Sequence, residues 1–289
     1  MKKLIVSFLF ALGLVSCSNE VPEPDAPEVV SNTSRLLSLD GPDLHCDVEY
    51  DDMGRVLSAE LHDDTRTYYA EYKYDKDHIY ISCRWNDSQH GNVLKEDTLF
   101  LVDGRVDSCA GKFLNDYRIR NKMEAERFYV KIRYNERGEM IYSWSEDVWP
   151  YYLSPSSSPK IQIYYWWTTY EWKDGNIVKT ASDSNKKNEG YPYSQSYSYS
   201  SLPGNNVLME ARYVRPEYYA LVENGYFGVA CKNLMESFED DDGFGLKYDY
   251  ELDSQKRVVT IKEIRTYEGY DYFRVEAYNL KWSNAVNGQ

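Results

Sequence analysis

One short pattern recurs along most of this chain and constrains its fold more than any other feature. Each copy has an alternating, aromatic-rich segment, a cluster of Asp, Asn or Glu with Gly, and then Arg or Asn before a second alternating segment. The copies span residues 48–56, 101–106, 132–140, 170–177 and 248–258, with a looser copy at 72–79. Gly and Asn adopt the positive φ of tight turns, and a period of two is typical of strands. Each copy therefore predicts a β-hairpin.

Hairpins that follow one another through short loops predict an antiparallel meander. A meander of this length is expected to curl, because large twisted open sheets close or split. We therefore predict an all-β fold, an antiparallel meander of β-hairpins curled into a barrel or half-barrel with little helix. The one helix that we expect lies near residues 232–239. Between Leu252 and Arg257 the usual Gly is missing, so we expect a longer or bulged turn there.

The N-terminal segment has a different character. Lys2 and Lys3 precede an unbroken apolar run from Leu4 to Val15, and Cys17 closes a Leu-Val-Ser-Cys tetrad at its end. This arrangement is typical of a lipoprotein signal peptide, whose Cys is acylated and becomes the mature N-terminus. The run is shorter than the roughly 20 residues that span a bilayer. We expect residues 1–16 to be removed and acyl chains on Cys17 to attach the protein to a membrane.

The remaining chain divides into a tether and one domain. Residues 17–34 are acidic and rich in Pro, and they show no apolar period, which is typical of an extended linker. Residues 35–289 carry the hairpin pattern without a break that would mark a domain boundary. The residue after Cys17 is Ser18, which is not an acidic signal for retention in the inner membrane. We expect a lipid-anchored protein of the outer membrane, on its periplasmic leaflet or at the cell surface.

The charge of the chain argues against nucleic acid as a partner. The whole sequence has 33 Lys and Arg against 47 Asp and Glu. Loss of Lys2 and Lys3 leaves 31 basic residues against 47 acidic ones, a formal charge of −16. Such a surface repels nucleic acid and anionic lipid head groups, so the acyl chains must supply the membrane attachment.

Four cysteines remain after Cys17, and none of them indicates a metal or redox site. Cys46, Cys83, Cys109 and Cys231 lack the close CxxC spacing of such sites. In an oxidising compartment four cysteines could pair in three ways. We favour small buried residues on strands, but a disulfide stays open. The sequence predicts no metal ion and no cofactor.

A membrane-spanning barrel is also an antiparallel meander, but its strands carry an apolar band that faces lipid. Here charges occur in both alternations. Arg127, Lys131 and Arg133 share one face of a predicted strand, and Glu71 and Lys73 interrupt the aromatic face of another. The sequence therefore favours a soluble barrel on a lipid tether.

Aromatic segments carry the most suggestive functional signal. In residues 164–172 both faces of the predicted strand are aromatic, so one face must be covered by a loop, a partner or a ligand. Flat rings beside hydrogen-bonding groups suit stacking on sugar rings. The alternative is that these rings form the core of the barrel. The candidate ligand-binding residues are Tyr164, Trp166, Trp167, Tyr170 and Trp172.

Catalytic motifs are absent from the sequence. It contains no HExxH, no GxSxG and no Gly-rich phosphate loop, and its four histidines are His45, His62, His78 and His90. Carboxylate pairs suited to a glycosidase are expected by chance among 47 acidic residues. The acidic run at residues 239–243 lacks the ligand spacing of calcium loops and is expected to be a solvated loop. The sequence leaves an enzymatic role open but favours none, and it assigns no catalytic residue.

The order of these motifs resembles a known family. Tyr-x-Tyr-Asp-x-x-Gly-Arg hairpins precede residues 170–178, then Gly225-Tyr-Phe-Gly228, then a final Tyr-x-Tyr hairpin beginning at Tyr248. This order resembles an uncharacterised lipoprotein family of gut Bacteroidetes, a domain of unknown function with a porin-like fold, over residues 35–282. Single hairpins of this type also resemble those of YD-repeat proteins. The resemblance implies barrel topology, and it implies no activity.

Three functional hypotheses follow from the sequence. The first is a non-catalytic envelope protein that binds a glycan or a small-molecule ligand through aromatic surfaces. The second is a structural or interaction scaffold of the outer membrane with an envelope protein as its partner. The third, less favoured, is a polysaccharide hydrolase, which would need converging carboxylates or a His and carboxylate pair in a pocket.

Overall fold

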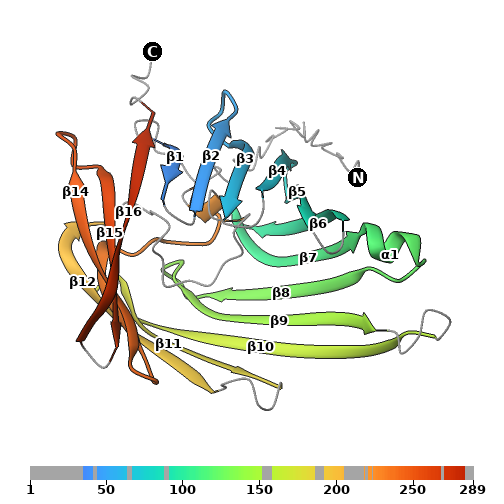
Figure 1. Ribbon diagram of the computed structural model, residues 1–289. Helices are drawn as coiled ribbons and strands as arrows, with labels where there is room; N and C mark the ends of the chain where they lie inside the picture. The colour runs from blue at the N-terminus through green and yellow to red at the C-terminus, as the bar shows by residue number, and fades with distance from the viewer. Residues whose placement is uncertain are drawn as a thin grey trace, which may run out of the picture.

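The computed structural model describes residues 35–41, 44–63, 67–87, 91–151, 158–185, 192–204, 218, 221–222, 224–267 and 270–283. These residues form a closed antiparallel β-barrel of sixteen strands (Figure 1). The strands are β1 (Leu36–Asp40), β2 (Leu44–Tyr50), β3 (Val56–Asp63), β4 (Thr67–Tyr74), β5 (His78–Asp87), β6 (Gly91–Val102), β7 (Arg105–Asn115), β8 (Glu126–Tyr134), β9 (Met140–Tyr151), β10 (Lys160–Lys173), β11 (Asn176–Ser184), β12 (Tyr193–Pro203), β13 (Asn233–Asp240), β14 (Phe244–Leu252), β15 (Val258–Tyr267) and β16 (Tyr270–Trp282). The predicted all-β meander is confirmed, and the barrel is closed rather than half open.

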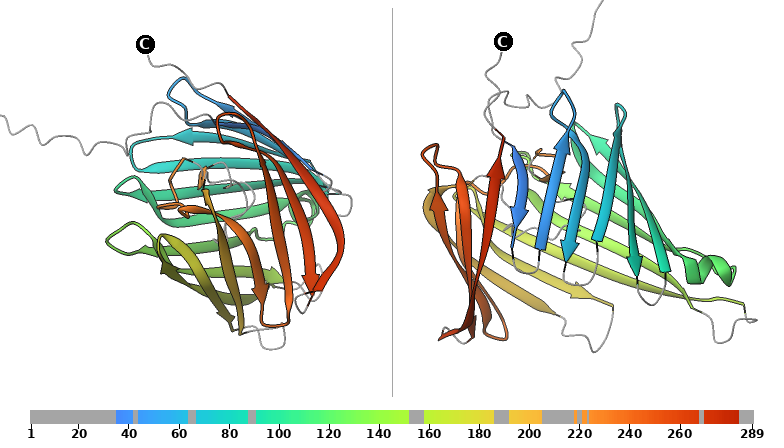
Figure 2. Two further views of the ribbon diagram at one scale, coloured as in Figure 1. Left: turned by 90° about the vertical axis from the view of Figure 1, so that its left-hand side faces the viewer. Right: turned by 45° about the horizontal axis from the view of Figure 1, so that its top comes forward.

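Each strand pairs with its neighbours in sequence, and β1 pairs with β16 to close the ring (Figure 2). At this seam Leu39 lies opposite Leu280. The seam is extended by Arg35 and Ser283, because the Ser283 N–H donates to the Arg35 carbonyl at 2.8 Å and the Arg35 N–H donates to Ser283 Oγ at 2.9 Å. The first and last described residues therefore lie side by side.

The predicted hairpins all lie at one end of the barrel, which we call the turn end. They connect β2 to β3, β4 to β5, β6 to β7, β8 to β9, β10 to β11 and β14 to β15. The other end, which we call the loop end, carries the connections that follow odd-numbered strands, including α1 (Asp116–Arg120). The side chain of Asn115 caps α1 by accepting a hydrogen bond from the Arg118 N–H at 2.8 Å. The copies of the repeated sequence motif therefore form the turns at one end of the barrel.

A shared turn geometry explains the motif. In the β2–β3 turn, Oδ1 of Asp51 accepts the N–H groups of Met53 and Arg55 at 3.0 and 2.9 Å, and Gly54 has a φ of 78°. A β-bulge between Glu49 and Tyr50 accompanies this turn. The Asp or Asn side chain therefore nucleates the turn, and Gly supplies the left-handed backbone.

The turn without Gly has the same design. Oδ1 of Asp253 accepts the N–H groups of Gln255 and Arg257, and Lys256 takes the left-handed conformation with a φ of 61°. The register shift between Glu251 and Leu252 confirms the bulge predicted here. A lysine thus occupies a position where Gly is the usual residue.

Aromatic side chains form a second element of the turn-end rim. Near the end of seven of the eight even-numbered strands, a Tyr or Trp donates a hydrogen bond to a backbone carbonyl near the start of the preceding strand. The donor and acceptor pairs are Tyr50 and Leu36, Tyr74 and Val56, Tyr134 and Val106, Trp172 and Met140, Tyr199 and Ile177, Tyr250 and Met235, and Trp282 and Val258. This explains why the motif begins with an aromatic residue.

The two faces of the wall differ in polarity. Lumen-facing side chains include fully buried Ile79, Leu99 and Ile261. Outward-facing side chains form cross-strand ion pairs, such as Arg84 with Glu71 at 2.9 Å. Burial of the lumen face supplies the hydrophobic stabilisation, as in any half-buried sheet.

Two further expectations about local structure have different outcomes. The helix expected near residues 232–239 is wrong, because these residues lie in or beside strand β13. There Leu234 and Met235 are buried and pair the strand with its neighbours, so sheet context overrides helix propensity.

Cys17, residues 1–16 and the tether at residues 17–34 lie outside the described residues. Among the described residues, no helix is long and apolar enough to cross a membrane.

The connection between β12 and β13 folds into the lumen at the turn end. We call its described part, residues 218, 221–222 and 224–232, the plug. Leu221 is fully buried and Phe227 is 2% exposed. The plug is fastened to the rim by backbone hydrogen bonds, from Val106 N–H to the Tyr226 carbonyl at 2.8 Å and from Val229 N–H to the Gly138 carbonyl at 3.0 Å.

Candidate ligand-binding site

A cavity of about 490 Å³ lies inside the barrel along β8–β12. The alternation of these strands directs small polar side chains into the lumen, where the other half of the barrel places Ile and Leu. Side chains this short leave the space unfilled. The small polar lining residues are Ser143, Ser145, Thr168, Thr180, Ser182 and Gln195.

The plug and the turn-end rim close one end of the cavity. The rings of Tyr218 and Phe227 stack at 5.8 Å with an angle of 22°, and both line the cavity. Ile132 and Met140 line it beside them, and both are buried. The site is therefore a cup with an apolar and aromatic floor.

Hydroxyl groups line part of the walls of the cup. Thr168 Oγ1 and Ser182 Oγ lie 2.8 Å apart, and Ser143 Oγ lies 3.1 Å from the Tyr170 hydroxyl. Each hydroxyl has one donor and two acceptor positions, so these contacts leave capacity for a ligand. Asp147 is the single lining residue with a charged side chain.

An aromatic ladder runs along β9 and β10 into the cup. Trp149 and Tyr164 pack edge to face at 5.9 Å, and Tyr164 packs on Trp166 at 5.7 Å. Trp166 lines the cavity, whereas Trp149 is 46% exposed near the loop end. The register places all three rings on the lumen side, because Trp149, Tyr164 and Trp166 alternate with outward-facing neighbours. The ladder therefore connects solvent at the loop end with the cup.

The structure separates the five residues that the sequence suggested. Tyr164 and Trp166 belong to the ladder. Tyr170 is 5% exposed and contacts Ser143 in the wall, and Trp172 donates from Nε1 to the Met140 carbonyl at 2.7 Å in the rim. Trp167 lies on the opposite strand face, directed away from the lumen, although it borders the cavity wall. The prediction that this strand is aromatic on both faces is correct.

The second aromatic segment also contributes to the lumen. Tyr193 lines the cup, and Tyr197 donates to Gln195 Oε1 at 2.7 Å and lies 3.0 Å from Thr180 Oγ1. Burial raises the pKa of Tyr197 above its usual value, so its hydroxyl stays protonated. Tyr191 lies outside the described residues.

Sequence reasoning missed the hydroxyl lining, Asp147 and Trp149. The sequence does contain a signal for the hydroxyl lining, because Ser143-Trp144-Ser145 alternates a small polar residue with a large one. Such alternation is read by default with the polar residue toward water. In this wall the small residue faces the lumen instead, which only the closed register reveals.

A buried ion pair holds the plug. Lys95 Nζ lies 2.9 Å from Asp97 Oδ2, and side-chain exposures of 8% and 1% place both in the interior. The Tyr218 hydroxyl donates to the same Asp97 oxygen at 2.7 Å and lies 3.0 Å from Cys109 Sγ. Because Tyr218 also lines the cup, this cluster connects the floor of the cup to the wall.

The described cysteines are free thiols. Cys46, Cys83 and Cys109 are buried, and Cys231 is half-buried. Burial raises the pKa of Cys83 to about 11, so its thiol is protonated at neutral pH. No group of three or more His, Cys, Asp or Glu side chains suited to a metal ion occurs within the described ranges.

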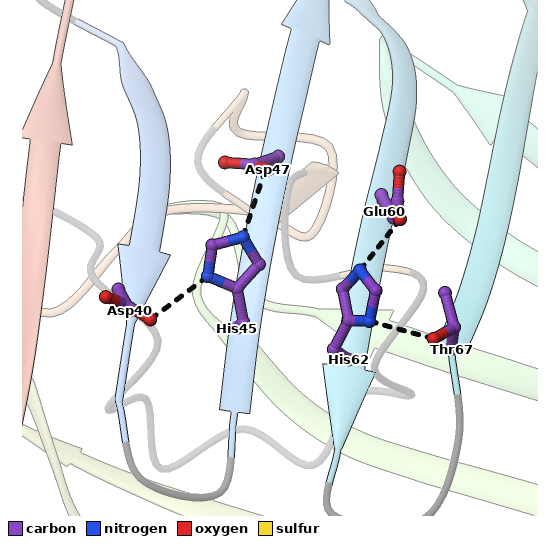
Figure 3. Close-up of polar contacts among 6 residues, drawn as sticks. All are labelled: Asp40, His45, Asp47, Glu60, His62 and Thr67. Atoms are coloured by element: carbon purple, nitrogen blue, oxygen red, sulfur yellow. Dashed lines mark hydrogen bonds and ion pairs between the residues drawn. The ribbon is translucent and has the colours of Figure 1, made fainter.

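Histidine and carboxylate pairs occur on the wall rather than in the cup. His45 Nδ1 lies 3.1 Å from Asp40 Oδ1, and its Nε2 lies 3.0 Å from Asp47 Oδ2 (Figure 3). Hydrogen bonding to Asp47, opposed by partial burial, raises the pKa of His45. His62 lies beside it with a ring separation of 5.6 Å. His90 lies outside the described residues. His45 and His62 occupy the outward face of β2 and β3, and His78 Nδ1 lies 3.0 Å from Asp75 Oδ1 at the β4–β5 turn.

The acidic run at residues 239–243 forms the β13–β14 turn. Oδ1 of Asp240 accepts the N–H groups of Asp242 and Phe244 at 3.0 and 2.9 Å, and Asp241 accepts from the Ser194 hydroxyl at 2.6 Å. These carboxylates are used for turn formation and strand connection.

Comparisons with known proteins identify the fold but no family. No family model matches the sequence, and no curated protein matches it. A solved porin-like protein from Bacteroides uniformis ATCC 8492 aligns with a TM-score of 0.57 and 11% identity, over 90% of this chain and 100% of that one. A second, from Bacteroides vulgatus ATCC 8482, has a TM-score of 0.56 and 12% identity, over 87% and 99% of the two chains. The barrel is therefore a porin-like fold.

Proposed function

We propose that this protein is a non-catalytic binding protein of the cell envelope, which holds a small hydroxyl-rich ligand, such as part of a glycan, in the cup. The observation that carries the proposal is a lumen cavity lined by hydroxyl groups and Trp166. Pockets that combine aromatic faces with a few placed polar groups are the usual form of small-ligand sites. A sugar ring above Trp166 would pack its C–H groups on the indole face, while the hydroxyl groups of the wall bind the sugar oxygens.

The proposal includes attachment of the barrel to the outer membrane through acyl chains on Cys17. The signal-like N-terminus supports this location, and the two porin-like structures of similar fold come from Bacteroides. The outward face of the wall also supports a barrel outside the lipid. Its ion pairs Lys112 with Glu96 and Lys262 with Glu251 would be strongly unfavourable against acyl chains.

The test is a binding screen of the mature protein against glycans and small metabolites, read by tryptophan fluorescence. Ser145→Leu fills the cup beside Trp166, its register partner on β10, and is expected to abolish binding. Filling an empty cavity with an apolar side chain leaves folding largely intact. The matched control is Ser198→Leu, because Ser198 is exposed on the outward face of β12 and does not line the cup.

The proposal fails if no compound binds, or if every compound that binds the wild type binds Ser145→Leu equally well. Radiolabelled palmitate incorporation into the wild type, and its loss in Cys17→Ala, checks the anchor separately. A protein that binds its ligand but incorporates no palmitate would retain the binding function and lose the anchor.

A scaffold role is the second candidate, and the outward aromatic cluster on β8–β10 favours it. Trp144 and Tyr165 stack at 5.8 Å with an angle of 21°, and Tyr129 packs edge to face on Trp144 at 6.1 Å. A closed barrel has no free strand edge, so a partner would have to use this face. Crosslinking in intact cells, compared between the wild type and Trp144→Ala, tests this role.

A further inference from the structure

We infer that the cup binds the end of a linear glycan chain, which enters from the loop end along the aromatic ladder and stops at the plug. The inference rests on the proposed function and adds the form and direction of the ligand. Three features carry it: the ladder, the closed floor and the hydroxyl groups of the lining.

The ladder determines the path. Trp149, Tyr164 and Trp166 are successive rings on the lumen side of two paired strands, separated by 5.9 and 5.7 Å. These steps are close to the length of one pyranose unit along an extended chain. A single sugar needs only the innermost ring, whereas a chain can use all three. The exposed position of Trp149 gives the path an entrance in solvent.

The closed floor determines that the glycan chain ends inside the cup. Tyr218 is held to Asp97 at 2.7 Å, and Phe227 stacks on Tyr218. The Lys232 N–H further fastens the plug to the Gly175 carbonyl at 2.9 Å. These bonds lie between the cup and the turn end, so a chain cannot pass through the barrel. The site is a closed well, which fits a chain terminus and excludes the middle of a polymer.

The lining matches a ligand rich in hydroxyl groups. Among the described residues, serine, threonine and tyrosine hydroxyls and the Gln195 amide line the cup. Hydroxyl groups can both donate and accept hydrogen bonds, so they suit the hydroxyl groups of sugars.

The experiment measures the affinity of the full mature protein for linear malto-, cello-, xylo- and manno-oligosaccharides of increasing length. For a series that binds, affinity is expected to rise with length while new sugars reach Tyr164 and Trp149, and then to become constant. Trp149→Ala is expected to weaken the longer members about two- to tenfold and leave the shortest member unchanged. Tyr267→Ala, a similarly exposed ring on β15, is the control.

End-blocked oligosaccharides then test the closed floor. One isomer carries a bulky group at the reducing end and the other carries it at the non-reducing end. A closed well accepts one isomer like the parent compound and loses at least about tenfold in affinity for the other.

The outcomes separate this inference from the proposed function. If Ser145→Leu abolishes binding but both blocked isomers bind alike, or Trp149→Ala has no effect at any length, the end-on inference is wrong and the binding function stands. If no oligosaccharide binds, or Ser145→Leu binds like the wild type, the lumen site for glycans is itself wrong.

Discussion

The two halves of the lumen are built from the same alternating strands but contain different side chains. In the half formed by β3–β7, Ile79, Ile81 and Leu99 point inward and are at most 2% exposed. In the half formed by β8–β12, Ser143, Ser145 and Thr168 occupy equivalent inward positions and border a cavity. Strand pairing is continuous around the ring, so side-chain volume alone decides whether the lumen is a core or a cup. The comparison assigns stability to the packed half and locates the proposed binding site in the hollow half.

The largest effect is expected at the buried ion pair on β6, whose Asp97 accepts a hydrogen bond from Tyr218 of the plug. Asp97→Ala leaves the Lys95 ammonium buried without its carboxylate and should lower the free energy of unfolding by about 3–5 kcal/mol. Denaturant titration measures this change. Lys95→Met combined with Asp97→Leu removes both charges and should recover most of the loss. Equal destabilisation in the single and double variants would contradict the role of the charge pair.

The next prediction compares one residue from each half. Leu99→Ala creates a cavity in the packed half and should lower the free energy of unfolding by about 2–5 kcal/mol. Ser145→Ala, in the hollow half, should change it by no more than about 0.5 kcal/mol. Thermal and denaturant unfolding of both variants provide the measurement. A similar loss in the two variants would remove the distinction between the halves.

Substitutions in the turn-end rim should have the same effect on stability in the packed half and in the hollow half, because the rim runs through both. Tyr74→Phe and Tyr199→Phe each remove one hydroxyl that donates to a backbone carbonyl at 2.8 Å. Each should lower the free energy of unfolding by about 1 kcal/mol. The unfolding midpoints of the two variants in denaturant are compared directly. If only the packed-half variant were destabilised, the rim would not be a uniform element.

The smallest effect is expected on the outer wall, at His45. Its pKa is raised in the folded protein above the unfolded value of 6.5, first through the hydrogen bond to Asp47. Its contribution to stability is therefore complete below about pH 6.5 and is lost as the pH rises through the folded pKa. His45→Gln should flatten the pH dependence of unfolding in that window by less than about 1 kcal/mol, since the pair is exposed. An unchanged pH profile would show that the pair contributes nothing.

Local features of the fold were predictable, and features that depend on closure were not. The hairpins follow from turn chemistry within a few residues, as at Asp51 and Gly54, so the sequence pattern locates them correctly. The helix expected at residues 232–239 is wrong because burial between β12 and β14 outweighs local propensity.

The candidate site illustrates the same limit. Aromatic alternation correctly placed Tyr164 and Trp166 on one face of a strand, but it could not say that this face is the lumen. The serines of β9 read as solvated positions until the register turns them inward. Tyr218 reaches Asp97 across 121 residues of sequence, a contact that no local pattern contains. The side chains that line the lumen could therefore be identified only from the three-dimensional register of the strands.

The seam between β1 and β16 has a consequence for orientation. Arg35 and Ser283 meet at the turn end, beside the plugged side of the barrel. The described domain therefore begins and ends on the closed side, whereas the ladder opens at the opposite end through Trp149. The proposed anchor on Cys17 would thus join the barrel on the side opposite the mouth of the cup.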